Sequence, residues 1–113
     1  MLPFKNRLAK RDDIQKVYQR GVFAAKGGLI VKYLSNQLPD TRIGFSTEKK
    51  FFPKAVERNR AKRLLREATR PLIQRIRPGL DIMIICKNQD DVHHFGKLTG
   101  KVETLLKQTN LLT

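Results

Sequence analysis

The stretch "AVERNRAKRLLREATR", residues 55–70, combines an apolar helical pattern with six arginines and lysines. Successive side chains of a helix are rotated by about 100° around its axis. In this stretch, that rotation places the small and aliphatic side chains on one stripe and most of the cationic side chains on the opposite side. The apolar stripe consists of Ala61, Leu64, Leu65, Ala68 and, one turn further on, Leu72. The opposite side consists of Asn59, Lys62, Arg63, Arg66 and Arg70, flanked by Arg58 and Arg60. The pattern therefore predicts a helix that packs on a sheet and presents a dense cationic surface.

This surface differs from an ordinary solvated helix face, which mixes charges of both signs. Only Glu57 and Glu67 offset the six positive charges. Like charges four residues apart, such as Lys62 and Arg66, each cost a helix roughly 0.2–0.5 kcal/mol. Arginine outnumbers lysine here, which favours forked contacts with phosphate. We therefore favour a nucleic-acid surface over a solvated face. A membrane surface is disfavoured because the apolar stripe is needed to cover the sheet.

The charge of the whole chain supports the same interpretation. Its 113 residues carry 24 Lys and Arg against 10 Asp and Glu, a formal net charge of +14. From Asp81 to Thr113, four basic residues balance four acidic ones, so the excess lies in residues 1–80. Such a concentration of positive charge destabilises the folded protein through self-repulsion, and its main use is to attract a polyanion. The length predicts a single domain over residues 1–113.

The remaining composition excludes several classes of protein. No apolar run approaches the roughly 20 residues of a membrane span. The opening "MLPFKNRLAKRDD" lacks the apolar core of a secretory signal, so we expect a cytoplasmic protein with no membrane partner. The single cysteine, Cys86, excludes an internal disulfide framework and a multi-cysteine metal site. At the end of an apolar strand, it is expected to be a small buried hydrophobe.

Periodicity and turn residues predict three helices and four strands. The expected helices are residues 6–20 (secure from Asp12 onward), 53–76 and 90–112. The expected strands are residues 22–25, 29–34, 42–47 and 80–86. The nearly continuous apolar run "LDIMIIC", residues 80–86, predicts a strand buried on both faces. Pro53 suits the first turn of its helix. The order α-β-β-β-α-β-α predicts an α+β sandwich, a small mixed sheet with helices packed on it.

No pattern of a protein active site occurs. There is no supported Ser/His/Asp or Cys/His arrangement, no glycine-rich phosphate loop, no HExxH and no CxxC. The pairs Asp12–Asp13 and Asp90–Asp91 fall at expected helix starts, where capping and the helix dipole favour aspartate. Adjacent His93 and His94 would point about 100° apart on a helix, which is wrong for one metal. We assign no catalytic and no metal-binding residue to the chain.

Three segments together resemble the protein subunit of bacterial ribonuclease P. They are "IGFSTEKK" (43–50), the basic stretch, and "LDIMIICK" (80–87). The triplet Arg58-Asn59-Arg60 inside A-V-x-R-N-R-x-K-R-L-x-R-E is the signature of that family. "RLAKRDDIQKVYQRG", residues 7–21, is also similar to the family's opening helix. The resemblance covers residues 7 to about 87 by motif, and the last helix by order and length.

The resemblance implies a holoenzyme in which a large RNA subunit performs the chemistry. That RNA uses Mg²⁺ to hydrolyse one phosphodiester of precursor tRNA, which frees the 5′ leader. The protein, as a subunit of this endoribonuclease, would bind the catalytic RNA and receive the leader in a cleft, as a monomer in the holoenzyme. The family's basic helix joins two strands through a left-handed crossover, against the usual rule.

Carried over position by position, the resemblance assigns three groups of residues. The catalytic RNA would be contacted by Arg58, Asn59, Arg60, Lys62, Arg63, Arg66 and Arg70. The family's double lysine ahead of the helix, a further RNA contact, is matched by Lys49 and Lys50. The leader cleft would contain Tyr18 and Ile14 from the first helix, and Ile30 and Lys32 from one strand face. Ile14 occupies a position that is usually aromatic in the family. An isoleucine there can make apolar contact with the leader but cannot stack on a base.

Without the resemblance, several of these residues have ordinary structural interpretations. Tyr18, four residues after Ile14, fits a core position of a helix. Lys49 and Lys50 fit a solvated loop, and the following Phe51–Phe52 pair is expected to anchor the helix entry. A small structural RNA-binding protein of ribosomal type shares the charge but not the connected motif. A DNA-binding module would need a recognition helix after a short helix-turn-helix.

Overall fold

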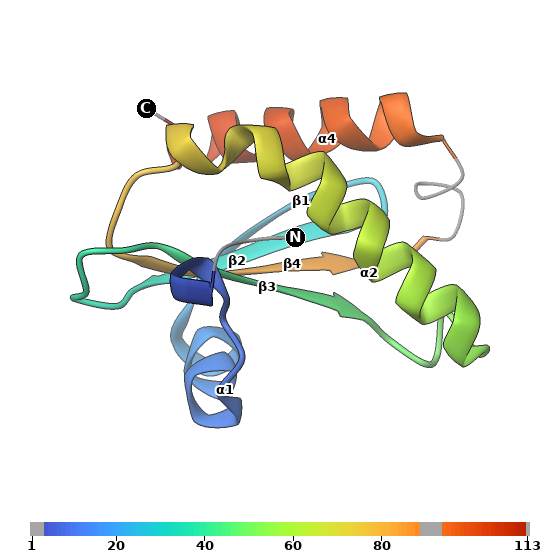
Figure 1. The fold of residues 1–113 in the computed structure, drawn as a ribbon, viewed down its shortest axis with the longest axis horizontal. Helices are drawn as coiled ribbons and strands as arrows, with labels where there is room; N and C mark the ends of the chain where they lie inside the picture. Colours follow the sequence, from blue (N-terminus) through green and yellow to red (C-terminus); the bar gives the residue numbers. More distant parts are fainter. Residues whose placement is uncertain (1–3, 89–93, 113) are drawn as a thin grey trace.

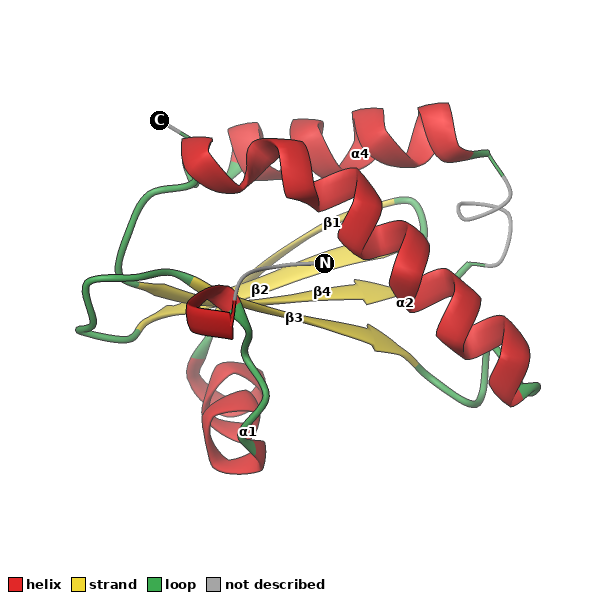
Figure 2. Ribbon diagram, in the orientation of Figure 1, coloured by secondary structure: helices red, strands yellow, loops and turns green. Residues whose placement is uncertain are grey.

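A four-stranded mixed sheet separates one helix from two others in the computed structural model, which describes residues 4–88 and 94–112. The strands are β1 (Val22–Lys26), β2 (Leu29–Ser35), β3 (Arg42–Thr47) and β4 (Leu80–Cys86). The helices are α1 (Arg11–Arg20), α2 (Ala55–Thr69) and α4 (Phe95–Gln108), with short 3₁₀ helices η1 (Phe4–Asn6) and η2 (Arg70–Arg75). Figures 1 and 2 show α2 and α4 above the sheet and α1 below it. The predicted order and the α+β class are confirmed.

The sheet has the strand order β1-β2-β4-β3. The pairs β1–β2 and β2–β4 are antiparallel, whereas β3 and β4 are parallel. Parallel neighbours need a crossover, and α2 provides it. In Figure 1, β3 lies in front of β4 and both point to the right, while the chain returns over the top through α2. This path is left-handed, as the resemblance implies and against the common preference.

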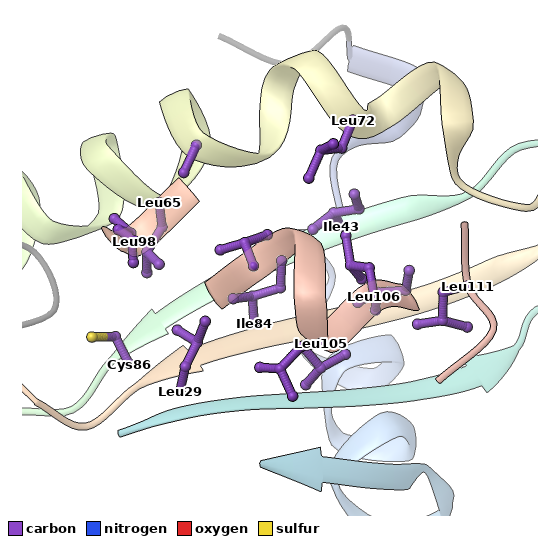
Figure 3. Packing of buried hydrophobic residues seen from close by; sticks show 14 of the residues in the cluster. Leu29, Ile43, Leu65, Leu72, Ile84, Cys86, Leu98, Leu105, Leu106 and Leu111 are labelled. Atoms are coloured by element: carbon purple, nitrogen blue, oxygen red, sulfur yellow. The ribbon is translucent and has the colours of Figure 1, made fainter. Parts of the chain in front are cut away.

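The main core lies between the upper face of the sheet and the helices α2 and α4. Figure 3 shows it as a continuous layer of aliphatic side chains from all these elements. Its fully buried members include Leu29, Val31, Ile82, Ile84, Leu65, Leu98, Leu105 and Leu106. Cys86 is buried in the same layer, which confirms its prediction as a small hydrophobe. β4 is buried on both faces as its sequence predicts.

The lower face of the sheet is covered much less. A small cluster of Leu8, Val17 and Met83 holds α1 there, with Ile14 and Leu34 packed against it. Outside this cluster, Ile30 and Lys32 of β2 stay partly exposed and Phe23 of β1 is exposed. The upper face of the sheet is therefore buried in the main core, whereas the lower face leaves an open surface beside α1.

The boundaries of the basic helix differ from the prediction. The α-helix begins at Ala55, so Pro53 precedes it, and it ends at Thr69 instead of Ile76. Proline lacks the N–H that the next α-helical bond needs, and its ring clashes with the preceding turn. Because Pro71 stands one residue after Arg70, the chain tightens into the 3₁₀ helix η2.

The other two helix starts also require correction. α1 begins at Arg11, and Lys10 at its N-cap position makes no side-chain cap. Asp12 and Asp13 therefore do not cap the helix; they lie in its first turn, where the helix dipole still favours them. α4 begins at Phe95, later than predicted. The expected caps Asp90 and Asp91, and also His93, lie outside the described residues, while His94 is exposed.

Candidate nucleic-acid interface

The outer surface of α2 is a row of cations above a buried stripe. Ala61, Leu65 and Ala68 are fully buried, as the helical pattern predicts. Leu64 is only partly buried and lies at the edge of that stripe. The predicted contacts Asn59, Arg60, Arg63 and Arg66 are exposed, Lys62 is partly exposed, and Arg70 is exposed at the start of η2. The structure thus brings six of the seven predicted helix residues together on one accessible surface.

These cations have few acidic partners within the protein. In the described part of the chain, ion pairs join Lys5 with Asp40, Arg42 with Asp13 and Asp81, and Glu103 with Arg75 and Lys107. None of them involves a side chain of α2. Unpaired, exposed arginines keep their forked N–H groups available for phosphate oxygens.

Arg58 differs from the other arginines of α2. Its Nη1 atom donates hydrogen bonds to the backbone oxygens of Phe52 (2.8 Å) and Pro53 (3.0 Å). Its own carbonyl accepts a hydrogen bond from the Thr47 hydroxyl at 3.2 Å. Arg58 therefore joins the end of β3, the connecting loop and the first turn of α2. The remaining N–H groups of its guanidinium are still available to a phosphate.

The predicted double lysine lies in the loop between β3 and α2. Lys49 and Lys50 are both exposed, so the cationic surface continues past the start of the helix. The Lys50 Nζ atom is 5.6 Å from the centre of the Phe51 ring, and Lys87 Nζ lies 5.8 Å from the same ring. Phe52 is buried against the core, which confirms that this aromatic pair anchors the helix entry.

The predicted cleft residues meet on the lower face of the sheet. The Lys32 Nζ atom lies 4.8 Å from the centre of the Tyr18 ring, a cation–π contact between β2 and α1. Tyr18 is 37% exposed, so its alternative interpretation as a core residue is wrong. Ile30 is partly exposed and shares the strand face of Lys32 because side chains alternate. Ile14 instead packs against the small cluster under the sheet.

Phe23 belongs to the same open face and was not predicted from the sequence. It is 66% exposed and pairs directly with Lys32 in the β1–β2 ladder. Directly paired residues point to the same face of a sheet, so Phe23 stands beside the Tyr18–Lys32 contact. The sequence carried a usable signal, because the Gly27–Gly28 turn sets the hairpin register that places residue 23 opposite residue 32.

A partly buried ionic group links α1 to the sheet. Arg42 of β3 forms a two-pronged contact with Asp81 of β4, at 2.8 Å from Nε and 2.7 Å from Nη2. Its Nη1 atom is 3.3 Å from a carboxylate oxygen of Asp13 in the first turn of α1. The hydrogen bond to Asp81, reinforced by the charges of both aspartates, raises the pKa of Arg42. The Arg42–Asp13 contact thus adds to the cluster around Val17 in holding the helix that carries Tyr18.

The model of the ribonuclease P family matches residues 2–110, nearly the whole chain. The chain belongs to the ribonuclease P protein family. The ribonuclease P protein component of Symbiobacterium thermophilum is 41% identical, covering 94% of this chain and 92% of that protein. That of Caldanaerobacter subterraneus subsp. tengcongensis is 35% identical, covering 93% and 90%. The family model also covers the last helix, whereas the motifs in the sequence end at about residue 87.

Solved structures of ribonuclease P proteins share the fold. The Staphylococcus aureus protein superposes with a TM-score of 0.82 at 27% identity, covering 96% of this chain and 98% of that one. The Thermotoga maritima protein gives a TM-score of 0.80 at 28% identity, covering 90% and 96%. Family and fold together remove the ribosomal-type and DNA-binding interpretations.

Proposed function

We propose that this chain is the protein component of ribonuclease P and assists removal of the 5′ leader from precursor tRNA. The observation that carries the proposal is the exposed cationic surface of α2, built from the family signature and without acidic partners on its helix. In this proposal α2 and the loop with Lys49 and Lys50 bind the catalytic RNA. Such phosphate contacts hold a protein in register on its RNA partner.

The leader would lie on the opposite side of the sheet. Tyr18 and Phe23 offer exposed aromatic rings, on which bases of any sequence stack, and Lys32 supplies a positive charge between them. Ile30 would provide apolar contact beside them. Ile14 would act indirectly, because it packs in the cluster that supports α1. The two RNA partners thus meet opposite faces of one thin sheet.

The chain is a subunit of an endoribonuclease, and we assign its chemistry to the RNA subunit. Within residues 4–88 and 94–112, no group of three His, Cys, Asp or Glu side chains is placed to hold a metal ion. Asp13 and Asp81 are engaged with Arg42. The described side chains therefore offer no such three-ligand site, and we derive no step of the reaction through Mg²⁺. The protein supplies positive charge and binding surfaces.

No helix among the described residues is long and apolar enough to cross a membrane. We place the protein in the cytoplasm, with the precursor tRNA that it would bind. We also propose one copy per catalytic RNA, because the two surfaces of a single copy already provide separate sites for the catalytic RNA and the leader.

Reconstitution tests the proposed function. The protein is mixed with a bacterial ribonuclease P RNA, and cleavage of precursor tRNA is followed at low Mg²⁺ concentration. We expect cleavage to be faster than with the RNA alone, with the cut at the mature 5′ end. A folded protein that binds the RNA but leaves the cleavage rate unchanged would contradict the proposal and favour a purely structural role.

A further inference from the structure

A groove of about 950 Å³ lies between α2 and the edge of the sheet at β3. Residues 7–9 close its other side, because this segment runs along β3. The Leu8 N–H donates a hydrogen bond to the carbonyl of Ile43 at 3.0 Å. The volume is within the range of sites that hold small organic molecules. None of the RNA contacts proposed above requires a groove.

Part of the groove lining is apolar. Phe45 of β3 is half-buried against the core. Val56 of α2 lines the groove as well and is 79% exposed, which is unusual for an aliphatic side chain among cations. The described part of the chain pairs the opening segment with β3 at a single bridge, Arg7–Ile43. Backbone groups alternate in direction along a strand, so the N–H and C=O of Phe45 point to the same edge as those of Ile43. The groove therefore combines apolar surface with a backbone donor and acceptor.

The rim of the groove is strongly cationic. Arg60, Arg63 and Arg66 line it from successive turns of α2, and all three are exposed. Three residues of helix advance about 4.5 Å, so these side chains follow the length of the groove. Glu67 is the one acidic residue of the lining. A phosphate-binding surface alone would need these cations but not the apolar part of the lining.

We propose that the groove receives one unpaired nucleotide of the catalytic RNA. Its base lies against Phe45 and Val56, with its edge toward the backbone of Phe45, and its flanking phosphates contact Arg60, Arg63 and Arg66. A base in a duplex is stacked and paired, so it cannot enter, whereas single-stranded loops and bulges present bases in this way. The inference rests on the proposed function, since it takes the catalytic RNA as the partner of α2.

Two variants separate the groove from the charged surface around it. Ala9→Trp fills the groove at an exposed position and changes no charge. Ala55→Trp adds the same bulk at an exposed position of α2 that does not line the groove. A third variant, Val56→Ser, removes the apolar surface without adding bulk. Thermal unfolding followed by circular dichroism shows that each variant is folded before it is tested.

The holoenzyme is then probed with dimethyl sulfate and a carbodiimide, which modify the pairing edges of accessible bases. We expect the unaltered protein and Ala55→Trp to protect an unpaired base of the catalytic RNA, and Ala9→Trp and Val56→Ser to expose it. Replacing that nucleotide with an abasic one should weaken binding of the unaltered protein about tenfold, and binding of Ala9→Trp much less.

The outcomes distinguish the groove from the function on which it rests. If the unaltered protein does not stimulate cleavage, the proposed function fails. If it stimulates cleavage but the protein and its three variants give the same base reactivities, only the groove assignment is overturned. Loss of protection in Ala55→Trp as well would also overturn it, because the effect would then follow added bulk anywhere on α2.

Discussion

Replacing Arg42 with methionine should destabilise the protein strongly. The change removes both hydrogen bonds to Asp81, whose side chain is only 8% exposed. The Asn36 amide, which donates to Asp81 Oδ1 at 2.9 Å, cannot neutralise the carboxylate. Removing one partner of a buried ion pair costs about 3–5 kcal/mol, because the other charge stays buried without compensation. Arg42 is itself 21% exposed, so we expect the lower end, about 3 kcal/mol.

Urea denaturation monitored by circular dichroism measures this change in the free energy of unfolding. Lys5→Met is the matched control, because Lys5 forms a 4.0 Å pair with Asp40 in which both side chains are largely exposed. Such a pair contributes about 0–1 kcal/mol. The double variant Arg42→Met/Asp81→Asn should recover much of the loss, since the buried carboxylate of Asp81 is then absent. If Arg42→Met costs no more than Lys5→Met, the assignment of Arg42 as a structural anchor is wrong.

Two further predictions concern the RNA surfaces. Arg60→Gln should weaken binding of the catalytic RNA and should reduce by about one unit the slope of the logarithm of the binding constant against the logarithm of salt concentration. Arg75→Gln is the control, because Arg75 pairs with Glu103, and it should change neither the affinity nor the slope. Binding titrations at several salt concentrations measure both, and equal slopes for the two variants would contradict the assignment. Tyr18→Ala and Phe23→Ala should each weaken binding of precursor tRNA to the holoenzyme by roughly 1–3 kcal/mol while sparing mature tRNA. Equal losses for both RNAs would remove these rings from the leader surface.

The helix pattern predicted the docking of α2 because burial on a helix follows directly from its 3.6-residue period. The bounds of β3 and β4 were predicted correctly because glycine, proline and polar residues border both runs. The predicted end of α2 at Ile76 is wrong because the apolar pattern continues to that residue, whereas Pro71 supplies no N–H for the next α-helical bond. The backbone contacts of Arg58 depend on where the loop before α2 folds back, which no periodicity encodes.

Other features required the three-dimensional arrangement. Periodicity carries no information on the hand of the crossover, so that expectation came from the family alone. The groove forms only because residues 7–9 lie along β3, a long-range contact absent from any local pattern. Phe23 is a different case, because hairpin register alone would have placed it beside Lys32.

The unequal cover of the two sheet faces also bears on local stability. Elements held by few buried contacts open at a lower free energy than the whole protein. α1 is held by the small cluster of Leu8, Val17 and Met83 and by the Asp13–Arg42 pair, whereas α2 and α4 share the main core. A ligand that binds only the closed form stabilises it by mass action. A leader seated on Tyr18 would therefore slow the amide hydrogen exchange of α1 and leave the exchange of α4 unchanged.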